Sequence, residues 1–265
     1  AGTDAITGSW TALALTDGKA EFRIAPNQKA FVYVRATDAS GNVQVINSEG
    51  VVVYTDAEAI TETADFTMLE KTDITLDVKL NDNAVEALYN GDTLIDSGNY
   101  AVSENGTITL KNSYLYDLAA GEYTIRVQYN PMGEEFRTGD APAMTSVKLT
   151  VHKRMPNIVL NPGKRVYNGT PLKEKEIPFT VAYNGALVWE FKPADADDSA
   201  YTATAPKNAG VYTVRLTLAE TDRYKAASRT AAFEITPKEV TITGAAVEAS
   251  RVYNGTTGAV VIAPG

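Results

Sequence analysis

The chain has 265 residues, a formal net charge of −9 at pH 7, one histidine and no cysteine. Without cysteine there is no disulfide framework, no thiolate nucleophile and no cysteine-ligated zinc. Acidic and basic residues are interspersed and form no Lys/Arg stripe, which argues against nucleic acid and anionic membranes as partners.

The length is enough for two or three domains. No apolar run approaches the ~20 residues of a membrane span, so we expect no membrane insertion. No signal peptide opens the chain and Ala1 begins in mid-phrase, so we expect an excised or mature segment.

Residues 1–56 contain apolar runs separated by turn residues, which predicts about four strands. The runs are Trp10–Leu15, Ala20–Ile24, Val32–Ala36 and Val43–Val53. For Asp38, before the Ser40-Gly41-Asn42 turn, a turn-capping role is favoured over that of a calcium ligand. Residues 36–43 resemble the closing hairpin of bacterial Ig-like surface repeats, which implies a truncated module over 1–56.

Residues 57–153 form the clearest unit. Ile74, Leu76, Val78 and Leu80 alternate with polar residues, as in a strand with one buried face. Asn-Gly pairs at 90–91 and 105–106 predict tight hairpin turns.

The run Ile108–Leu118, preceded by Tyr100-Ala101-Val102, resembles the X2 module of cellulosomal and other Gram-positive surface proteins. The resemblance covers about residues 62–150. It implies an Ig-like sandwich that acts as a spacer or as a weak binder of polysaccharide or cell wall. It gives no binding residue.

One phrase, Gly121–Val127, returns almost unchanged as Gly210–Leu216, 89 positions later. A period near the size of a small β-domain indicates tandem modules. In both copies alternate residues are apolar, with Thr124, Arg126 and Gln128 between them in the first, so each is predicted to be a half-buried strand. Lys29–Val34 is a degenerate third copy, in which Phe31 replaces the tyrosine.

Tyr123 and Tyr212 each follow a small, turn-like approach. This resembles the tyrosine corner of immunoglobulin-like sandwiches, whose hydroxyl bonds back to the upstream backbone. Ile125 and Val214 stand where an antibody domain carries its second cysteine, so aliphatic packing replaces the disulfide. The alternative is a strand of another antiparallel β-protein.

Residues 154–237 open at Met155-Pro156 and close at Ile235-Thr236-Pro237. Two apolar runs, 179–183 and 187–191, flank Asn184-Gly185-Ala186. A two-residue turn would place their aromatic residues on opposite faces, whereas a three-residue loop pairs Val181 with Trp189 and collects them on one face. Burial favours the three-residue loop.

A second phrase, Arg165–Thr170 (Arg-Val-Tyr-Asn-Gly-Thr), recurs at Arg251–Thr256. With Tyr224–Ala227 and the Thr-Pro-Lys linker, it resembles the MBG/YDG-type repeats of bacterial adhesins, with asparagine in place of aspartate. For 154–237 this leaves a β-grasp-like variant open. Residues 238–265 begin a further copy, which must lean on its neighbour or belong to a longer protein.

No set of residues predicts a catalytic or metal site. His152 is the only imidazole and ends a strand beside a linker, so a nucleophile triad is disfavoured. Two acids would suffice for glycoside hydrolysis, but no segment predicts a cleft. Asp195-Ala196-Asp197-Asp198 could seat calcium, but a solvated loop is favoured. Asn-Gly-Thr at 105, 168 and 254 fits hairpin turns better than glycosylation acceptors.

Exposed aromatic residues are the remaining candidates for a binding site, because sugar rings stack on them. The candidates are Tyr89, Tyr114, Tyr116, Trp10 and Trp189, and buried packing is the alternative for each. Tyr114 and Tyr116 share one face if their segment is extended, so we predict them as the ligand-binding pair.

The expected fold is all-β: tandem Ig-like antiparallel β-sandwich modules in an elongated arrangement. The expected function is a non-catalytic stalk or adhesin segment of a bacterial surface protein, extracellular or attached to the cell wall. We expect a monomer, no cofactor, and a glycan, host surface or cell wall as partner. The alternatives are a carbohydrate-binding module in 57–153 and an accessory part of a glycan-active enzyme.

Overall fold

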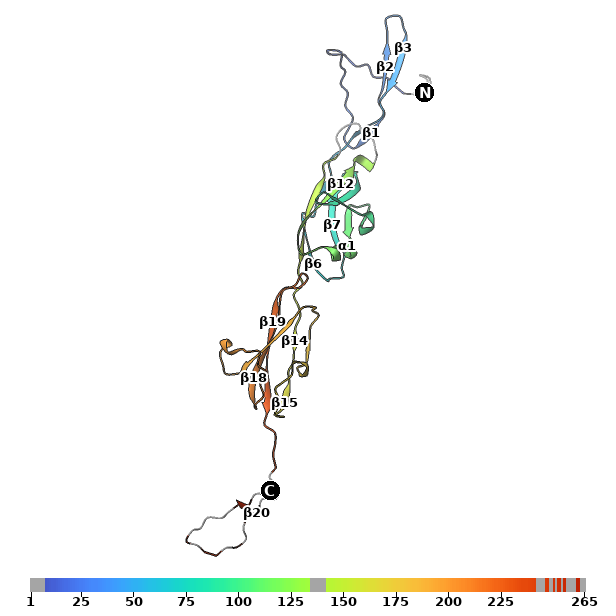
Figure 1. Cartoon of the computed structure of the whole chain (residues 1–265). Helices are drawn as coiled ribbons and strands as arrows, with labels where there is room; N and C mark the ends of the chain where they lie inside the picture. Colours follow the sequence, from blue (N-terminus) through green and yellow to red (C-terminus); the bar gives the residue numbers. More distant parts are fainter. Residues whose placement is uncertain are drawn as a thin grey trace. The chain divides into compact units, whose positions relative to one another are not determined.

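The computed structural model describes residues 8–133 and 142–241, together with 246–247, 250, 252–253, 255 and 261–262 (Figure 1). The chain divides into two compact units, Ala1–Arg154 and Met155–Gly265. This division lies one residue from the boundary expected between 57–153 and 154–237. The module boundaries, this one included, stay predictions.

The described residues of the first unit form strands β1–β13 and one α-helix. Their bounds are β1 Gln28–Ala30, β2 Tyr33–Thr37, β3 Val43–Asn47, β4 Val51–Val53, β5 Glu58–Ala59, β6 Thr63–Thr67, β7 Ile74–Lys79, β8 Ala84–Asn90, β9 Thr93–Ile95, β10 Tyr100–Val102, β11 Thr107–Leu110, α1 Asn112–Asp117, β12 Gly121–Asn130 and β13 Thr145–His152. Short 3₁₀ turns lie at Ser97–Asn99 and Pro131–Gly133.

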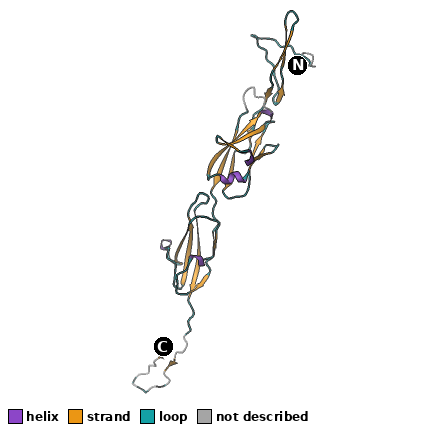
Figure 2. Ribbon diagram, turned by 45° about the vertical axis from the view of Figure 1, so that its right-hand side comes forward, coloured by secondary structure: helices purple, strands orange, loops and turns teal. Residues whose placement is uncertain are grey.

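Two sheets of this unit face each other across its core (Figure 2). One has the strand order β10-β11-β7-β5 and the other β6-β13-β12-β8-β9. The inner residues of β12 are Ile125, Val127 and Tyr129, all buried. The Tyr129 hydroxyl lies 2.6 Å from that of Thr145, so the buried phenol is hydrogen-bonded. The β-sandwich expected for 57–153 is confirmed, and its strands pair antiparallel except for β6 and β13, which run parallel.

The second unit is built from β14–β19. Their bounds are β14 Val159–Leu160, β15 Lys164–Val166, β16 Phe179–Thr180, β17 Leu187–Pro193, β18 Gly210–Leu218 and β19 Ala227–Thr236, with 3₁₀ turns at Glu174–Glu176 and Asp198–Ala200. The sheets are β15-β19-β18-β17 and β14-β16. Residues 155–241 include no α-helix that could cover a sheet, so the arrangement is a sandwich rather than β-grasp-like. Beyond it, β20 Ala246–Val247 pairs with β21 Val261–Ile262.

The two units share a strand arrangement. In each, an early strand runs parallel to the last strand, β6 to β13 and β15 to β19. The last strand is antiparallel to the strand that carries the repeated phrase, β12 or β18, and that strand is antiparallel to β8 or β17. The sequence repeat is therefore also a structural repeat.

The tyrosines that open the two repeated phrases make the same bond. The Tyr123 hydroxyl donates to the Ala119 carbonyl oxygen at 2.9 Å, and that of Tyr212 donates to Asn208 at 3.1 Å. Both bonds span four residues and have the form expected of a tyrosine corner. Gly121 and Gly210 also share φ = +158°. The two matching tyrosines thus occupy like surroundings.

Residues 8–56 differ from the prediction. The hairpin β2–β3 is present, but Trp10–Leu15 and Ala20–Ile24 form no strand, and Val43–Val53 divides into β3 and β4. Phe31 lies outside the strands and is 54% exposed, so it is not a third corner. The apolar alternation was misleading because this part of the chain contributes no residue to a buried core cluster.

Asp38 caps the β2–β3 turn, as predicted. Its carboxylate accepts the backbone N–H groups of Ser40 and Asn42 at 2.9 and 2.8 Å, and the Asn42 side-chain amide at 2.7 Å. These hydrogen bonds lower the pKa of Asp38. The bond from the Asn42 side chain has the largest effect, and the bond from the Asn42 backbone has the next largest.

The predicted hairpin over 179–191 is wrong. β16 pairs with β14, whereas β17 pairs with β18, so the two runs lie in different sheets. Phe179 meets Trp189 edge-on, with ring centroids 5.2 Å apart. The aromatic rings do come together, but across the core rather than along one face, because facing sheets bury them as effectively as a hairpin does.

Both Asn-Gly turns of the first unit are confirmed. Gly91 lies between β8 and β9 with φ = +58°, and Gly106 between β10 and β11 with φ = +90°. Gly106 also accepts the Val78 N–H at 3.0 Å, so its backbone lies directly against β7. A Cβ at Gly106 would overlap the Val78 carbonyl oxygen, whereas one at Gly91 would have no described atom within 4 Å.

Gly106→Ala should therefore destabilise the first unit by about 3 kcal/mol, because backbone strain and steric overlap combine. Gly91→Ala, with strain alone, should cost about 1 kcal/mol. Urea unfolding of the full chain, followed by circular dichroism, measures both. Equal losses for the two variants would contradict the close approach at Gly106.

Tyr212→Phe should destabilise the second unit by about 1 kcal/mol through the lost corner bond. Unfolding of the full chain would be followed by the emission of Trp189, which is 5% exposed, in a Trp10→Phe background. Tyr123→Phe is the matched control and should leave this transition in place. A Tyr212→Phe curve superimposable on the parent would count against the corner.

Candidate functional site

The segment that carries Tyr114 and Tyr116 is helical, so the prediction that both lie on one face of an extended segment is wrong. Helix α1 begins at Asn112, whose side-chain amide donates to the Glu70 carbonyl oxygen at 2.7 Å. The Asn112 N–H donates to the Asp73 carboxylate at 2.7 Å. These bonds to a distant loop fix a helix where local alternation favoured a strand. Residues two apart on a helix do not share a face.

The two tyrosines have different surroundings. Tyr114 packs against the core, and its hydroxyl accepts the Asn90 side-chain amide at 3.1 Å. Burial raises the pKa of Tyr114. Tyr116 is 43% exposed. The helix therefore offers one exposed ring rather than a pair.

The remaining candidate aromatic residues separate clearly. Trp189 is part of the buried core of the second unit. Trp10 lies under the Arg35 guanidinium, 4.8 Å from the ring centroid. Tyr89 lies on the outer face of the five-stranded sheet, because it pairs with Arg126 while the neighbouring Leu88 is buried. Tyr89 is thus the candidate ligand-binding aromatic residue that lies on a sheet.

A row of four side chains crosses this outer face. Register places Leu94, Tyr89, Arg126 and Ser146 opposite one another on β9, β8, β12 and β13. Adjacent strands are ~4.8 Å apart, so these side chains are direct neighbours. Leu94 is 60% exposed. The row combines an aromatic ring, an aliphatic side chain and two polar groups on a pleated surface.

Hydrogen bonds connect the polar groups of this face. The Tyr89 hydroxyl donates to Gln128 Oε1 at 2.9 Å, and Gln128 Nε2 donates to Glu86 at 3.1 Å. Arg126 donates to the Asp92 carboxylate at 2.9 Å, and its other terminal nitrogen lies 3.3 Å from Met144 Sδ. These bonds hold the ring and the guanidinium in defined positions. We call Glu86, Tyr89, Asp92, Leu94, Arg126 and Gln128 the outer-face cluster.

The sequence contained a signal for this cluster. Arg126 and Gln128 are polar positions of the repeated phrase, and Tyr89 precedes an Asn-Gly turn. What the sequence lacked was the pairing of β8 with β12, which brings residues from two strands together. Leu94 gave no signal, because an exposed leucine is expected on any protein surface.

The second unit places an arginine at the matching position, 89 residues later. Arg215 donates to Glu190 at 2.8 Å and lies 3.9 Å from the centroid of the Tyr201 ring. The bond to Glu190 raises the pKa of Arg215. Lys192 approaches the same ring and pairs with Asp198 at 3.0 Å. Here the aromatic ring contacts two cations of its own chain.

The candidate residues for catalysis or metal binding, His152 and the acidic stretch 195–198, do not form a catalytic or metal-binding group. The His152 imidazole ends β13 and lies 2.7 Å from the Asp65 carboxylate, at an exposed site. In the acidic stretch 195–198, Asp198 pairs with Lys192. Within residues 8–133 and 142–241, no group of three or more His, Cys, Asp or Glu side chains could hold a metal ion. No described helix is long and apolar enough to cross a membrane.

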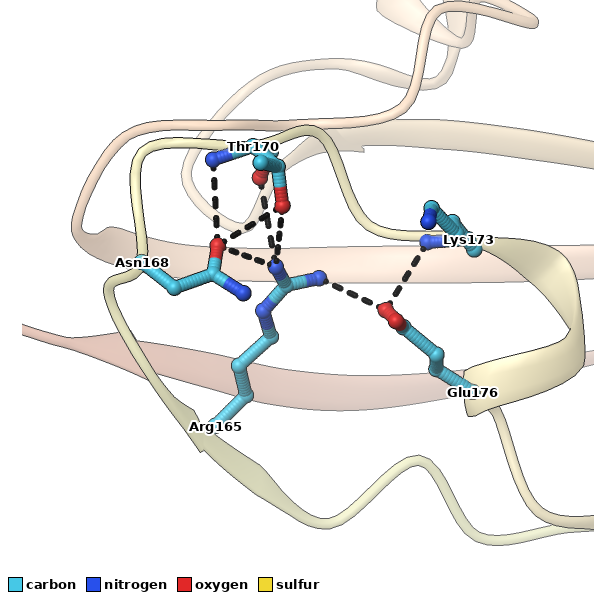
Figure 3. A network of polar contacts seen from close by, with 5 residues as sticks. All are labelled: Arg165, Asn168, Thr170, Lys173 and Glu176. Carbon is cyan, nitrogen blue, oxygen red and sulfur yellow. Dashed lines mark hydrogen bonds and ion pairs between the residues drawn. The ribbon is translucent and has the colours of Figure 1, made fainter.

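The repeated phrase Arg165–Thr170 forms a loop held by side-chain hydrogen bonds (Figure 3). Arg165 donates to Asn168 Oδ1 at 2.6 Å, to the Thr170 carbonyl oxygen at 3.2 Å and to the Glu176 carboxylate at 3.0 Å. Asn168 Oδ1 also accepts the Thr170 N–H at 3.0 Å, and Glu176 accepts the Lys173 N–H at 3.1 Å. The phrase therefore organises a turn.

This turn is not the predicted hairpin, because it joins β15 to a 3₁₀ turn rather than to an antiparallel partner strand. Gly169 has φ = +77°, as an Asn-Gly turn requires. In the second copy, Arg251, Asn254 and Thr256 lie outside the described residues. Val252 and Tyr253 are exposed.

Comparison with known families gives one match, to the family described as "Carbohydrate binding domain X2", over residues 60–137. The X2 resemblance predicted for about residues 62–150 is confirmed for this part. The match covers less than half of the chain. Comparison with curated proteins finds no match.

Solved structures give distant likenesses. A tri-modular GH5 (subfamily 4) endo-β-1,4-glucanase from Bacillus licheniformis is 15% identical, with a TM-score of 0.29, over 70% of this chain and 39% of that chain. A SusE-like surface-located polysaccharide-binding protein from Bacteroides thetaiotaomicron is 11% identical, with a TM-score of 0.28, over 84% and 46%. The chain thus spans less than half of either protein.

Asn168→Ala should destabilise the second unit by about 1–2 kcal/mol, because the carboxamide oxygen accepts bonds from both Arg165 and Thr170. Asn184→Ala, in an exposed loop, is the control and should change stability by less than about 0.5 kcal/mol. The Trp189 emission transition of the full chain measures both. Similar losses from both variants would contradict an organising role for the phrase.

Proposed function

We propose that residues 57–153 form a non-catalytic carbohydrate-binding module. The observation that carries the proposal is the match of residues 60–137 to the carbohydrate-binding domain X2 family. Support also comes from a folded sandwich with its own buried core over 57–151. The chain would act outside the cell or at the bacterial cell surface, as a monomer, on a polysaccharide, cell-wall or mucin-type glycan.

The test is binding of the full chain to a glycan array and to insoluble polysaccharides, with one unit unfolded at a time. Ile125 and Val214 occupy matching positions of β12 and β18, and both are completely buried. A carboxylate at either position should unfold its own unit, because a buried unpaired charge is strongly destabilising.

Ile125→Asp should abolish glycan binding while Trp189 still reports a folded second unit. Val214→Asp should unfold the second unit and leave binding within about twofold of the parent. Absence of binding by the parent chain to any glycan would overturn the proposal. Binding that survives Ile125→Asp and is lost in Val214→Asp would move the activity to the second unit.

For residues 155–236 we propose a spacing or presenting role, in the manner of an adhesin segment. The favouring observation is that the polar residues of its repeated phrase are engaged in bonds within the chain, as are Lys192 and Arg215. The resemblance to MBG/YDG-type repeats belongs to this proposal. Glycan binding retained by the chain after Ile125→Asp would contradict it.

The role of the module within a longer protein follows from the same proposal. A binding module can serve a surface protein or act as an accessory part of a glycan-active enzyme. In either case its contribution is to hold the partner at the glycan, without a catalytic step of its own. The predicted pair Tyr114 and Tyr116 is the alternative site within 57–153, and loss of glycan binding in Tyr116→Ala would favour it over the outer face of the sheet.

A further inference from the structure

We propose that the binding surface of the module is the outer-face cluster on β8, β9 and β12, and that it takes a neutral, extended polysaccharide. This inference rests on the proposed carbohydrate-binding function and locates its site. It depends on three observations, which are the position of Tyr89, the fixed polar groups around it and the local balance of charge.

Tyr89 is half-buried and presents part of its ring on a pleated face. A tyrosine offers a large, rigid contact area with a polar tip and loses little conformational entropy on binding. Its hydroxyl is held by Gln128 at 2.9 Å, so the ring is positioned before a ligand arrives. Leu94, opposite it on β9, is 60% exposed and extends the apolar surface across the strands. Together they can contact the C–H face of a sugar ring.

The polar residues of the outer-face cluster can form hydrogen bonds with a ligand beside the apolar surface of Tyr89 and Leu94. Arg126 carries five donor N–H groups, and its bond to Asp92 leaves further donors for ligand hydroxyls. Asp92 has a side chain that is 98% exposed and can accept from the same hydroxyls. A few fixed donors and acceptors beside an apolar surface are typical of ligand sites that select orientation.

The charges favour a neutral ligand. Arg126 is the only cation of the cluster and is paired with Asp92. The whole chain carries a net charge of −9 at pH 7. A polyanionic glycan would be repelled by this field, and the cations that the described part of this face offers, Arg126 and Lys148, are already paired with Asp92 and Glu122. A neutral polysaccharide is not repelled by the negative charge and needs no cations to pair with it.

The matching face of the second unit is an internal comparison. In the first unit, Arg126 lies opposite Tyr89 on the neighbouring strand. In the second unit, the equivalent Arg215 lies opposite Glu190 on the neighbouring strand. The aromatic residue of that face, Tyr201, already has Arg215 3.9 Å from its ring centroid. Since a guanidinium occupies the position that a sugar would need, the second face lacks the free aromatic surface. Arg126 and Arg215 therefore form a matched pair for mutation.

The experiment measures binding of the full chain to a soluble neutral β-glucan and to polygalacturonate by affinity electrophoresis. Tyr89→Ala should weaken binding to the neutral glucan at least tenfold, whereas Tyr89→Phe, which keeps the ring, should weaken it less than about threefold. Tyr116→Ala should leave binding unchanged. Circular dichroism melting curves verify that each variant is folded.

Arg126→Gln should weaken binding three- to tenfold, and Arg215→Gln should not change it. If the parent binds a glycan and Tyr89→Ala binds equally well, or only Tyr116→Ala loses affinity, the outer face is not the site although the module still binds. Stronger binding to polygalacturonate would overturn the neutral ligand class. If the parent chain binds no glycan, the proposed function fails together with this site.

Discussion

The fold depends on how the central strands β12 and β18 divide their residues between two faces. Ile125 and Val127 in one, and Val214 and Leu216 in the other, are completely buried. Each such side chain contributes about 1.5–3 kcal/mol, and no disulfide is available to replace them. Because strand residues alternate strictly, burying this set commits every intervening residue to the opposite face. Packing therefore determines which side chains are available to a ligand.

The two units use that opposite face differently. Both carry an arginine three residues after the corner tyrosine, and both pair it with a carboxylate. In the second unit the arginine also covers Tyr201, so cation and ring satisfy each other. In the first unit the ring belongs to the neighbouring strand and bonds to Gln128 instead. One scaffold thus supports a face whose ring is covered by a guanidinium and a face where a half-buried ring lies beside the exposed Leu94.

Much of this could be predicted from the sequence where the signal is local. The alternation around Tyr123 and Tyr212, and the turns at Gly91 and Gly106, depend on neighbours within a few residues. The pairing partners of 179–191 could not be predicted, because burial of aromatic residues is satisfied equally by one sheet or by two facing sheets. Helix α1 depends on bonds from Asn112 to residues 70 and 73, a contact between distant segments that no local pattern reveals. The outer-face cluster was missed for the same reason.

The most direct measurement of the central claim is a map of amide chemical shifts on the full chain during titration with a neutral β-glucan oligosaccharide. If the outer face of the five-stranded sheet is the binding surface, the largest changes should fall on residues 86–94 and 124–128, with little change in 112–117 or 187–218. Changes confined to helix α1, or to the second unit, would contradict the account.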